Sequence, residues 1–296
     1  MFVKKITKDT IFIKAPAKVN LFLEVLNKRQ DGYHNINSLF QVVSLYDNLT
    51  FTLMEKPEIE INLVNNINLS TKGDNLISKA YYLMEKTFNL KYGLRVALDK
   101  NIPIAAGLGG GSADAAATII ACNSLFKLGL DNKQMSLLAL SIGADIPFFF
   151  TSGQALVKGK GEILQETDFP VNYSMVLIYP EIFISTSDSY QELKRGLTFS
   201  KIPFNLAACH TTEDFISSLR LSGNDFEEIH FRTYPELERI KGVLLRNGAQ
   251  LARMSGSGPT IFGIFLEPPN IKDDNTVVQG NWHLDTVWPI TLSGQV

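Results

Sequence analysis

The feature that most constrains the fold is a glycine-rich segment that runs directly into an alanine-rich one. Residues 107–112 read Gly-Leu-Gly-Gly-Gly-Ser, and residues 113–125 contain neither glycine nor proline. Because alanine is the strongest helix former, this order predicts a loop that enters the N-terminus of a helix. The N–H groups of such a loop can converge on an anion, and the helix dipole adds about half a positive charge. The junction therefore predicts a phosphate-binding loop.

Two common phosphate-binding patterns do not fit this loop. No Gly-Lys-Ser or Gly-Lys-Thr follows it, as in a Walker loop, and Ser112 replaces the third glycine of a dinucleotide fingerprint that starts at Gly107. The alternative is a tight turn into the helix that needs glycine only for its positive φ. One glycine would be enough for such a turn. The four glycines from Gly107 to Gly111 therefore favour a phosphate loop of another type.

Composition sets the class of protein and argues against several partners. With 296 residues, of which 45% are hydrophobic, the chain is long enough for one large or two modest domains, and we expect two lobes. A formal net charge of −2 predicts no nucleic-acid or membrane partner and favours a small molecule. The two cysteines lack metal-ligand spacing, and we find no signal peptide or apolar run of about 20 residues, so we expect a cytoplasmic protein.

Hydrophobic spacing predicts a chain of mixed helices and strands. Alternating apolar residues predict a strand over 11–26, and the helical spacing that follows Asp74 or Asn75 predicts a helix capped by one of them. Further strands are expected at 39–43, 49–53, 94–98, 175–179 and 258–266. Further helices are expected at 133–142, 214–221 and 235–247. These patterns predict an antiparallel N-terminal sheet and an α+β arrangement in both halves.

Three motifs in a fixed order indicate a family resemblance. Residues 103–113, Pro-Ile-Ala-Ala-Gly-Leu-Gly-Gly-Gly-Ser-Ala, resemble the phosphate loop of the GHMP kinases, named for galactokinase, homoserine, mevalonate and phosphomevalonate kinases. Residues 15–21 resemble the first motif of that family, and residues 254–260 its third. The resemblance implies a two-lobed α+β fold with the active site in the cleft. The N-terminal ATP-binding lobe, expected over 1–165, would resemble ribosomal protein S5 domain 2, and an α+β C-terminal lobe is expected over 166–296.

Two further segments resemble one branch of this family. Residues 31–34, Asp-Gly-Tyr-His, and residues 143–148, Gly-Ala-Asp-Ile-Pro-Phe, are similar to the branch that phosphorylates a cytidine diphosphate-linked methylerythritol in the non-mevalonate isoprenoid pathway. The resemblance implies transfer of the ATP γ-phosphoryl group to the 2-hydroxyl of that substrate, with Mg²⁺ accompanying ATP. Two alternatives stay open, namely another GHMP kinase of the homoserine or mevalonate type and a non-catalytic ATP-binding protein of the same fold.

The resemblance assigns a catalytic pair. Asp145 matches the aspartate that accepts or orients the hydroxyl proton, and Lys18 matches the lysine that keeps this aspartate charged and polarises the hydroxyl. Without the motifs, Lys18 would be interpreted as a strand lysine that faces water, and Asp145 as a turn or N-cap residue before Pro147. Asp114 is a rival carboxylate that could simply favour the helix dipole, and we leave it outside the pair.

The resemblance also assigns a nucleotide site. Ser112 would hydrogen-bond a phosphate or ligate Mg²⁺, and both roles stay open. Lys100 matches a lysine near the nucleotide, and a solvated lysine after a strand is the alternative. The residues expected to contact ATP are Lys100, Pro103, Ile104, Ala105, Ala106, Gly107, Leu108, Gly109, Gly110, Gly111, Ser112 and Ala113.

Four residues are expected to bind the substrate. Tyr33 and Tyr190 match positions where aromatic rings stack on the cytosine base, and His34 matches a residue that hydrogen-bonds the edge of the base. The alternatives are a surface-turn histidine for His34 and an aromatic residue packed on a helix start for Tyr190. Asn20 lies two residues after Lys18 and so on the same face of a strand, from which it would reach the substrate. Its alternative is a buried amide satisfied by the backbone.

Overall fold

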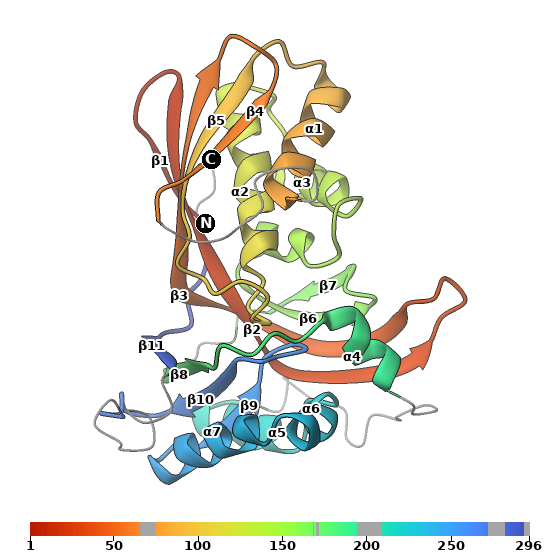
Figure 1. Ribbon diagram of the computed structural model, residues 1–296, viewed down its shortest axis with the longest axis vertical. Coiled ribbons are helices and arrows are strands. Elements are labelled where there is room, and N and C mark those ends of the chain that lie inside the picture. The colour runs from red at the N-terminus through yellow and green to blue at the C-terminus, as the bar shows by residue number, and fades with distance from the viewer. Residues whose placement is uncertain (66–74, 168, 170–171, 194–208, 272–281, 293–296) are drawn as a thin grey trace.

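The protein contains two sheets, each with helices on one face, and the longest hairpin of the first sheet projects past a helix of the second half (Figure 1). In this arrangement the α+β fold class predicted from the sequence is confirmed. The computed structural model describes residues 1–65, 75–167, 169, 172–193, 209–271 and 282–292. Among these residues, no helix has the length and apolar character that a membrane span requires.

The first sheet is built on two long antiparallel strands, β2 (Thr10–Lys28) and β3 (His34–Met54). The strand order is β1-β2-β3-β5-β4, and β6 pairs with β3 and with β7. These other strands are β1 (Phe2–Lys5), β4 (Ile59–Leu63), β5 (Gly93–Asp99), β6 (Gln154–Gly159) and β7 (Ile163–Glu166). The strands predicted at 11–26 and 94–98 are confirmed.

The strands predicted separately at 39–43 and 49–53 are one continuous strand, β3, so the predicted break was wrong. The polar residues between the two runs do not end the strand, because each has a partner. Asp47 is fully buried against Lys100, and Asn48 Nδ2 donates to Asp99 Oδ2 at 3.0 Å.

Helices cover one face of the first sheet (Figure 1). They are α1 (Leu76–Phe88), α2 (Gly110–Leu125), α3 (Asn132–Ala139) and the 3₁₀ helix η1 (Ile146–Phe150). The N-cap of α1 is Asn75, whose side chain accepts from Ile77 N at 2.9 Å, and Asp74 lies outside the described residues. The helix predicted to reach Ile142 ends at Ala139, because Ser141 N and Ile142 N turn back to carbonyls only three residues earlier.

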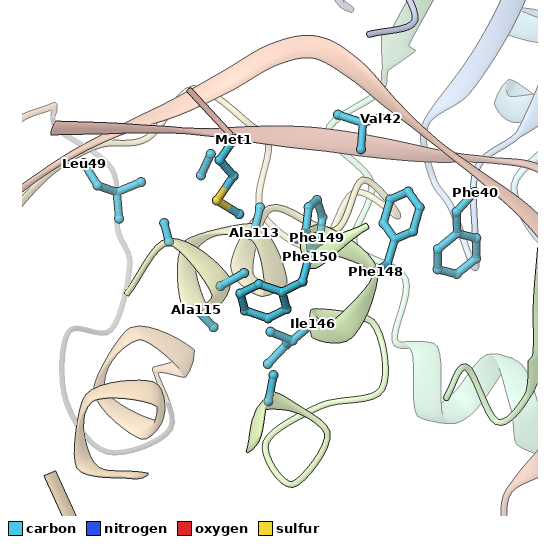
Figure 2. Close-up of a cluster of buried hydrophobic side chains, with 14 of the residues drawn as sticks. Met1, Phe40, Val42, Leu49, Ala113, Ala115, Ile146, Phe148, Phe149 and Phe150 are labelled. Atoms are coloured by element: carbon cyan, nitrogen blue, oxygen red, sulfur yellow. The ribbon is translucent and has the colours of Figure 1, made fainter. Parts of the chain in front are cut away.

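The alanine-rich helix α2 is a core element, and its composition follows from its surroundings. Every residue from Ala113 to Cys122 is buried. Small side chains let this helix lie close both to the β2–β3 pair and to α1. Figure 2 shows Phe148, Phe149 and Phe150 of η1 in the same hydrophobic cluster, between α2 and β3. This packing holds the start of η1 in place, directly after Asp145.

The second sheet is antiparallel, with the order β11-β8-β10-β9. Its strands are β8 (Ser174–Tyr179), β9 (Leu251–Met254), β10 (Ile261–Phe265) and β11 (His283–Val287). The helices of this half are α4 (Thr186–Glu192), α5 (Thr212–Arg220), α6 (Glu227–Thr233) and α7 (Pro235–Arg246). The strand predicted from residue 258 begins only at Ile261, since the preceding residues form a turn against the phosphate loop.

Candidate active site

A cavity of about 610 Å³ is lined by residues from both halves of the chain. The first half supplies the glycine loop over 103–112, Lys18 from β2 and Asp145 before η1. The second half supplies Tyr190 from α4 and the turn at Gly256. Segments that are far apart in the sequence therefore share one site.

The glycines of the phosphate loop are required for close approach as well as for backbone conformation. Gly107 has a φ of +76°, and a Cβ atom there would lie 2.2 Å from the carbonyl oxygen of Ser255. Gly109 has a φ of +69°, and its Cβ would lie 2.9 Å from Cγ of Lys18. Positive φ alone, the simpler alternative, therefore does not account for these glycines.

The loop places the uncapped N-terminus of helix α2 at the cavity. Helix α2 begins at Gly110, its N-cap Gly109 has no capping side chain, and both residues line the cavity. The first N–H groups of a helix have no partner within the helix and carry partial positive charge. Ala113, predicted to contact ATP, is fully buried in the core beneath the loop, whereas Ser112 is half-buried and lines the cavity.

Lys18 and Asp145 form an ion pair at the cavity, with Nζ and Oδ2 3.3 Å apart. Lys18 Nζ also donates to Asn20 Oδ1 at 2.6 Å and lies 4.2 Å from the centroid of the Phe40 ring. The side chain of Lys18 is only 5% exposed, so the interpretation as a water-facing strand lysine is wrong. Asp145 does occupy the N-cap position of η1, but its side chain makes no capping hydrogen bond.

Asn20 supports Lys18 through an amide that is hydrogen-bonded within the protein, and the residue also lines the cavity. Its Oδ1 accepts from Lys18, its Nδ2 donates to Ser38 Oγ at 3.1 Å, and its backbone N donates to Ser255 Oγ at 3.2 Å. The alternative of a buried, satisfied amide therefore describes Asn20, with side chains rather than the backbone as partners. Contact of Asn20 with a substrate stays a prediction.

Lys100 is enclosed by carboxylates, and the alternative of a solvated lysine is wrong. Its side chain is 4% exposed, and Nζ contacts Asp47 Oδ2 and, at 3.1 Å, Asp114 Oδ2. Asp47 Oδ1 also accepts the backbone N–H groups of Asn101 at 2.7 Å and Ile102 at 2.8 Å. Asp114 is thus an ion-pair partner, which goes beyond the predicted interaction with the helix dipole. Its Oδ1 is buried without a hydrogen-bond partner among the described residues.

Burial and neighbouring charges shift the pKa values of this buried cluster in opposite directions. Burial raises the pKa of Asp114 to about 8, although the nearby Lys100 ammonium opposes the shift. Burial lowers the pKa of Lys100, but the charges of Asp114 and Asp47 outweigh this effect, so the net shift is upward. Lys100 therefore remains charged at neutral pH.

The structure brings His34 and Tyr190 together. Their rings stack with centroids 5.4 Å apart and an interplanar angle of 19°, and Tyr190 lines the cavity. Burial, followed by the charge of Lys28, lowers the pKa of His34, which leaves a neutral imidazole with one donor and one acceptor. Tyr190 also meets Phe226 edge to face at 5.0 Å, so packing at the helix, its predicted alternative, is present as well.

Tyr33 is placed differently from this pair. Its side chain is 60% exposed, and Lys160 Nζ lies 4.8 Å from the centroid of its ring. Lys160 lines the cavity and was not predicted from the sequence. The only sequence signal for it was its position between Gly159 and Gly161, both at positive φ in the β6–β7 turn.

A polar pair of the second half lies at the cavity and was not predicted from the sequence. Thr186 Oγ1 and Ser257 Oγ lie 2.8 Å apart, and both residues line the cavity. Ser257 belongs to the predicted third motif, but Thr186 carried no signal of its own. This contact joins the start of α4 to the glycine turn.

Comparison with known proteins identifies the family. Residues 75–153 match the GHMP kinases N terminal domain, and residues 206–277 match the GHMP kinases C terminal domain. A 4-diphosphocytidyl-2-C-methyl-D-erythritol kinase of Thermodesulfovibrio yellowstonii is 38% identical over 275 residues, which cover 91% of this chain and 94% of that protein. The enzyme of the same name from Macrococcus caseolyticus is 36% identical over 272 residues, covering 91% of this chain and 95% of that protein.

Solved structures agree with these relatives. The crystal structure of a 4-(cytidine 5'-diphospho)-2C-methyl-D-erythritol kinase matches with a TM-score of 0.75 and 29% identity, over 93% of this chain and 98% of that one. A homoserine kinase from Cytophaga hutchinsonii matches with a TM-score of 0.77 and 20% identity, over 98% of both chains, which supports the shared fold alone. The predicted resemblance is confirmed, and the chain belongs to the 4-diphosphocytidyl-2-C-methyl-D-erythritol kinase family within the GHMP kinases.

Proposed function

We propose that the protein transfers the γ-phosphoryl group of ATP to the 2-hydroxyl of 4-diphosphocytidyl-2-C-methyl-D-erythritol, giving the 2-phosphate and ADP. The observation that carries this proposal is the Lys18–Asp145 pair, which lines the same cavity as the open N-terminus of α2. The names of the relatives, at 36% to 38% identity over most of the chain, support the substrate. The charge and cysteine content fit a small-molecule substrate in the cytoplasm.

The donor end of the reaction uses the phosphate loop. Phosphoryl transfer depends mainly on alignment of the reacting groups and on neutralisation of charge in the transition state. The N–H groups at the start of α2 provide partial positive charge for the ATP phosphates without a lysine in the loop. Lys18 N donates to Leu108 O at 2.9 Å, so the strand that carries the catalytic lysine is bonded directly to the loop.

At the acceptor end of the reaction, the substrate hydroxyl would meet the Lys18–Asp145 ion pair. Asp145 orients the substrate hydroxyl and takes its proton, while the hydroxyl oxygen forms a bond to the γ-phosphorus. The bond from the γ-phosphorus to the bridging oxygen breaks, and ADP leaves with that oxygen. The ammonium of Lys18, 3.3 Å from Asp145 Oδ2, polarises the hydroxyl and balances the negative charge of the carboxylate.

The residues at the loop fit Mg²⁺ bound together with ATP. The described residues contain no group of three or more His, Cys, Asp or Glu side chains arranged to hold a metal. Mg²⁺ at nucleotide sites needs no such cage, since it takes one or two protein oxygens and completes its shell with phosphates and waters. The half-buried Ser112 hydroxyl, which lines the cavity at the loop, would hold it together with the ATP phosphates. The ion would neutralise charge on the phosphates.

The residues at the cytidine end support the diphosphocytidyl alcohol as the substrate over homoserine or mevalonate. The neutral imidazole of His34 can donate to and accept from the edge of a base, and the rings of Tyr190 and Tyr33 supply stacking surface. Lys160 lies over the Tyr33 ring and lines the cavity, where its ammonium suits a diphosphate. A small amino acid or carboxylic acid would leave these groups without a partner.

The division into two domains stays part of this proposal. The first sheet ends with β7 at Glu166, and the second begins with β8 at Ser174. This supports a boundary close to the predicted one between 165 and 166.

A substrate panel tests the proposed function. The purified protein is incubated with ATP and Mg²⁺ and, separately, with the diphosphocytidyl alcohol, methylerythritol, homoserine and mevalonate, and both ADP and the phosphorylated product are measured. We expect turnover with the diphosphocytidyl alcohol alone and competitive inhibition by cytidine diphosphate. ADP formation with homoserine or mevalonate but not with the diphosphocytidyl alcohol would contradict the substrate. ATP binding without turnover on any alcohol would instead favour a non-catalytic protein.

A further inference from the structure

A short segment of the second half, Gly223–Glu227, is bonded to the edge of β2, and we call it the interlobe segment. Leu23 N donates to Gly223 O at 2.9 Å, and Asp225 N returns a bond to Leu23 O at 3.0 Å. Val25 N also donates to Asp225 Oδ2 at 2.8 Å. The segment therefore continues the sheet of the first half with residues that come from the second.

Asn224 in this segment bridges the segment to the third motif. Its side chain Nδ2 donates to Met254 O at 2.7 Å and to Gly256 O at 2.8 Å, and its Oδ1 accepts from Phe226 N at 2.9 Å. The residue is 6% exposed, so water offers no ready substitute for these bonds. A primary amide suits this position, because one nitrogen must donate to two carbonyls while the oxygen accepts.

The two carbonyls that accept from Asn224 belong to the residues on either side of Ser255, and Ser255 contacts both the phosphate loop and Asn20. Ser255 Oγ donates to Gly107 O of the phosphate loop at 2.9 Å and accepts from Asn20 N at 3.2 Å. Asn20 Oδ1 in turn holds Lys18 Nζ at 2.6 Å. Hydrogen bonds, linked through the covalent structure of residues 254–256 and of Asn20, thus connect Asn224 to both the donor loop and the catalytic lysine.

We propose that Asn224 is a positioning residue for phosphoryl transfer, which sets the distance between the phosphate loop and the Lys18–Asp145 pair through the turn at Ser255. Asn224 does not line the cavity, so it acts without touching either substrate. The proposal rests on the proposed function and adds a residue to it. The same amide also accepts from the backbone of Phe226, whose ring contacts Tyr190, so Asn224 is linked to the cytidine end as well.

The test is the Asn224→Asp variant, which keeps the shape of the side chain but replaces both donors with an oxygen. We expect kcat to fall about 10- to 100-fold, the range expected for misalignment of about 1 Å, while KM for ATP and for the alcohol changes less than about threefold. The matched control is Asn123→Asp. Asn123 is also a buried amide, with Nδ2 donating to Leu130 O and Oδ1 accepting from Leu130 N, both at 2.9 Å, at the far end of α2. It should lose thermal stability and keep kcat.

A second variant keeps the proposal testable if Asn224→Asp does not fold. Ser255→Ala removes only one hydroxyl, and it should lower kcat about tenfold because the bonds to Gly107 and Asn20 are lost. When both single variants fold, the double variant should be no slower than the slower single, since both act on one path. Wild-type kcat in either folded variant, or equal losses of kcat in Asn224→Asp and Asn123→Asp, would overturn the proposal.

The same measurements separate this proposal from the function on which it rests. A wild-type protein that does not phosphorylate the diphosphocytidyl alcohol contradicts the proposed function, and the positioning role fails with it. An active wild type with an unaffected Asn224→Asp variant contradicts only the positioning role.

Discussion

Two lysines lie beside the phosphate loop, and they differ in the carboxylates around them. Lys18 and Lys100 are almost equally buried, with 5% and 4% of their side chains exposed. Lys18 pairs with one carboxylate, Asp145, whose side chain is 38% exposed. Lys100 pairs with two, Asp47 and Asp114, whose side chains are 0% and 3% exposed. The exposure of the carboxylate, and not that of the lysine, distinguishes the two clusters.

This difference suits the Lys18 cluster to proton transfer and the Lys100 cluster to stabilising the phosphate loop. A carboxylate that takes a proton from a bound alcohol must reach the cavity, as Asp145 does. A fully buried ion pair adds little net stability, because desolvation offsets the attraction, yet removal of one partner is costly. Lys100 precedes the phosphate loop and Asp114 follows it, so their contact closes the base of the loop.

The largest expected effect is at the exposed carboxylate. Asp145→Asn keeps the size of the side chain but cannot accept a proton, so kcat should fall about 10²- to 10⁴-fold, the range for loss of a general base. ATP affinity should change little, because the loop and the start of α2 remain intact. ADP release measures the first quantity and calorimetric titration with ATP the second.

The control for this variant is Asp131→Asn. Asp131 caps α3 by accepting from Gln134 N at 2.7 Å, a role that asparagine fills equally well, so kcat should remain at the wild-type value. Turnover of Asp145→Asn within a few-fold of wild type would contradict the role of Asp145 as the base.

The proposed catalytic pair could be predicted from the sequence, whereas the buried cluster could not. Lys18 and Asp145 lie in motifs that resemble those of the family, so the resemblance pointed to both. The partners of Lys100 are set by tertiary packing, since Asp47 lies 53 residues away on another strand. Asn224 carried no signal for the same reason, because its two acceptors are backbone carbonyls about 30 residues distant.

The continuity of β3 illustrates the same limit at the level of the fold. Asp47 and Asn48 are polar residues in a strand, and their sequence favours a break. Only pairing with Lys100 and Asp99 makes the continuous strand favourable. Short-range patterns therefore predicted the elements and the motifs, and long-range pairing decided how they join.

The second prediction compares the two lysines directly. Lys100→Met leaves the buried Asp47 carboxylate without its cation and Asp114 without its polar partner, and should lower the free energy of unfolding by about 3–5 kcal/mol. Lys18→Met should cost less stability, because the 38% exposed Asp145 can be solvated from the cavity, but it should abolish most turnover. Urea unfolding gives the stabilities of both variants. Equal losses of unfolding free energy would remove the distinction between the two clusters.

The third prediction tests the space that the loop leaves for Lys18. Gly109 has a φ of +69°, and its Cβ would lie 2.9 Å from Lys18 Cγ, so Gly109→Ala should lower kcat/KM about 10- to 100-fold by moving that side chain. Gly129 has a φ of +71° with nothing within 4 Å, which makes Gly129→Ala a matched control. Both variants should lose about 1–2 kcal/mol of stability from the strained backbone. Similar kcat/KM values in the two variants would show that crowding at Lys18 is unimportant.

The last prediction concerns the proton on Asp114 and is a change of stability with pH rather than of turnover. Burial raises the pKa of Asp114 from its ordinary value of 3.8 to about 8 in the folded protein. The folded state then holds this proton over a pH range in which the unfolded chain has released it. The stability that the proton contributes is fully present below about pH 4 and is lost as the pH rises to about 8, at up to about 1.4 kcal/mol per pH unit.

Asp114→Asn isolates this contribution, because asparagine keeps the shape of the side chain and an oxygen for Lys100 but does not titrate. The free energy of unfolding of the wild type should therefore decrease relative to that of the variant between pH 5 and pH 8, and the difference should level off above about pH 8. Urea unfolding at half-unit pH intervals measures this difference. A constant difference across the range would mean that Asp114 is ionised in the folded protein. Lys100 would then pair with two carboxylates, and the Lys100 cluster would differ from the Lys18 cluster in charge as well as in exposure.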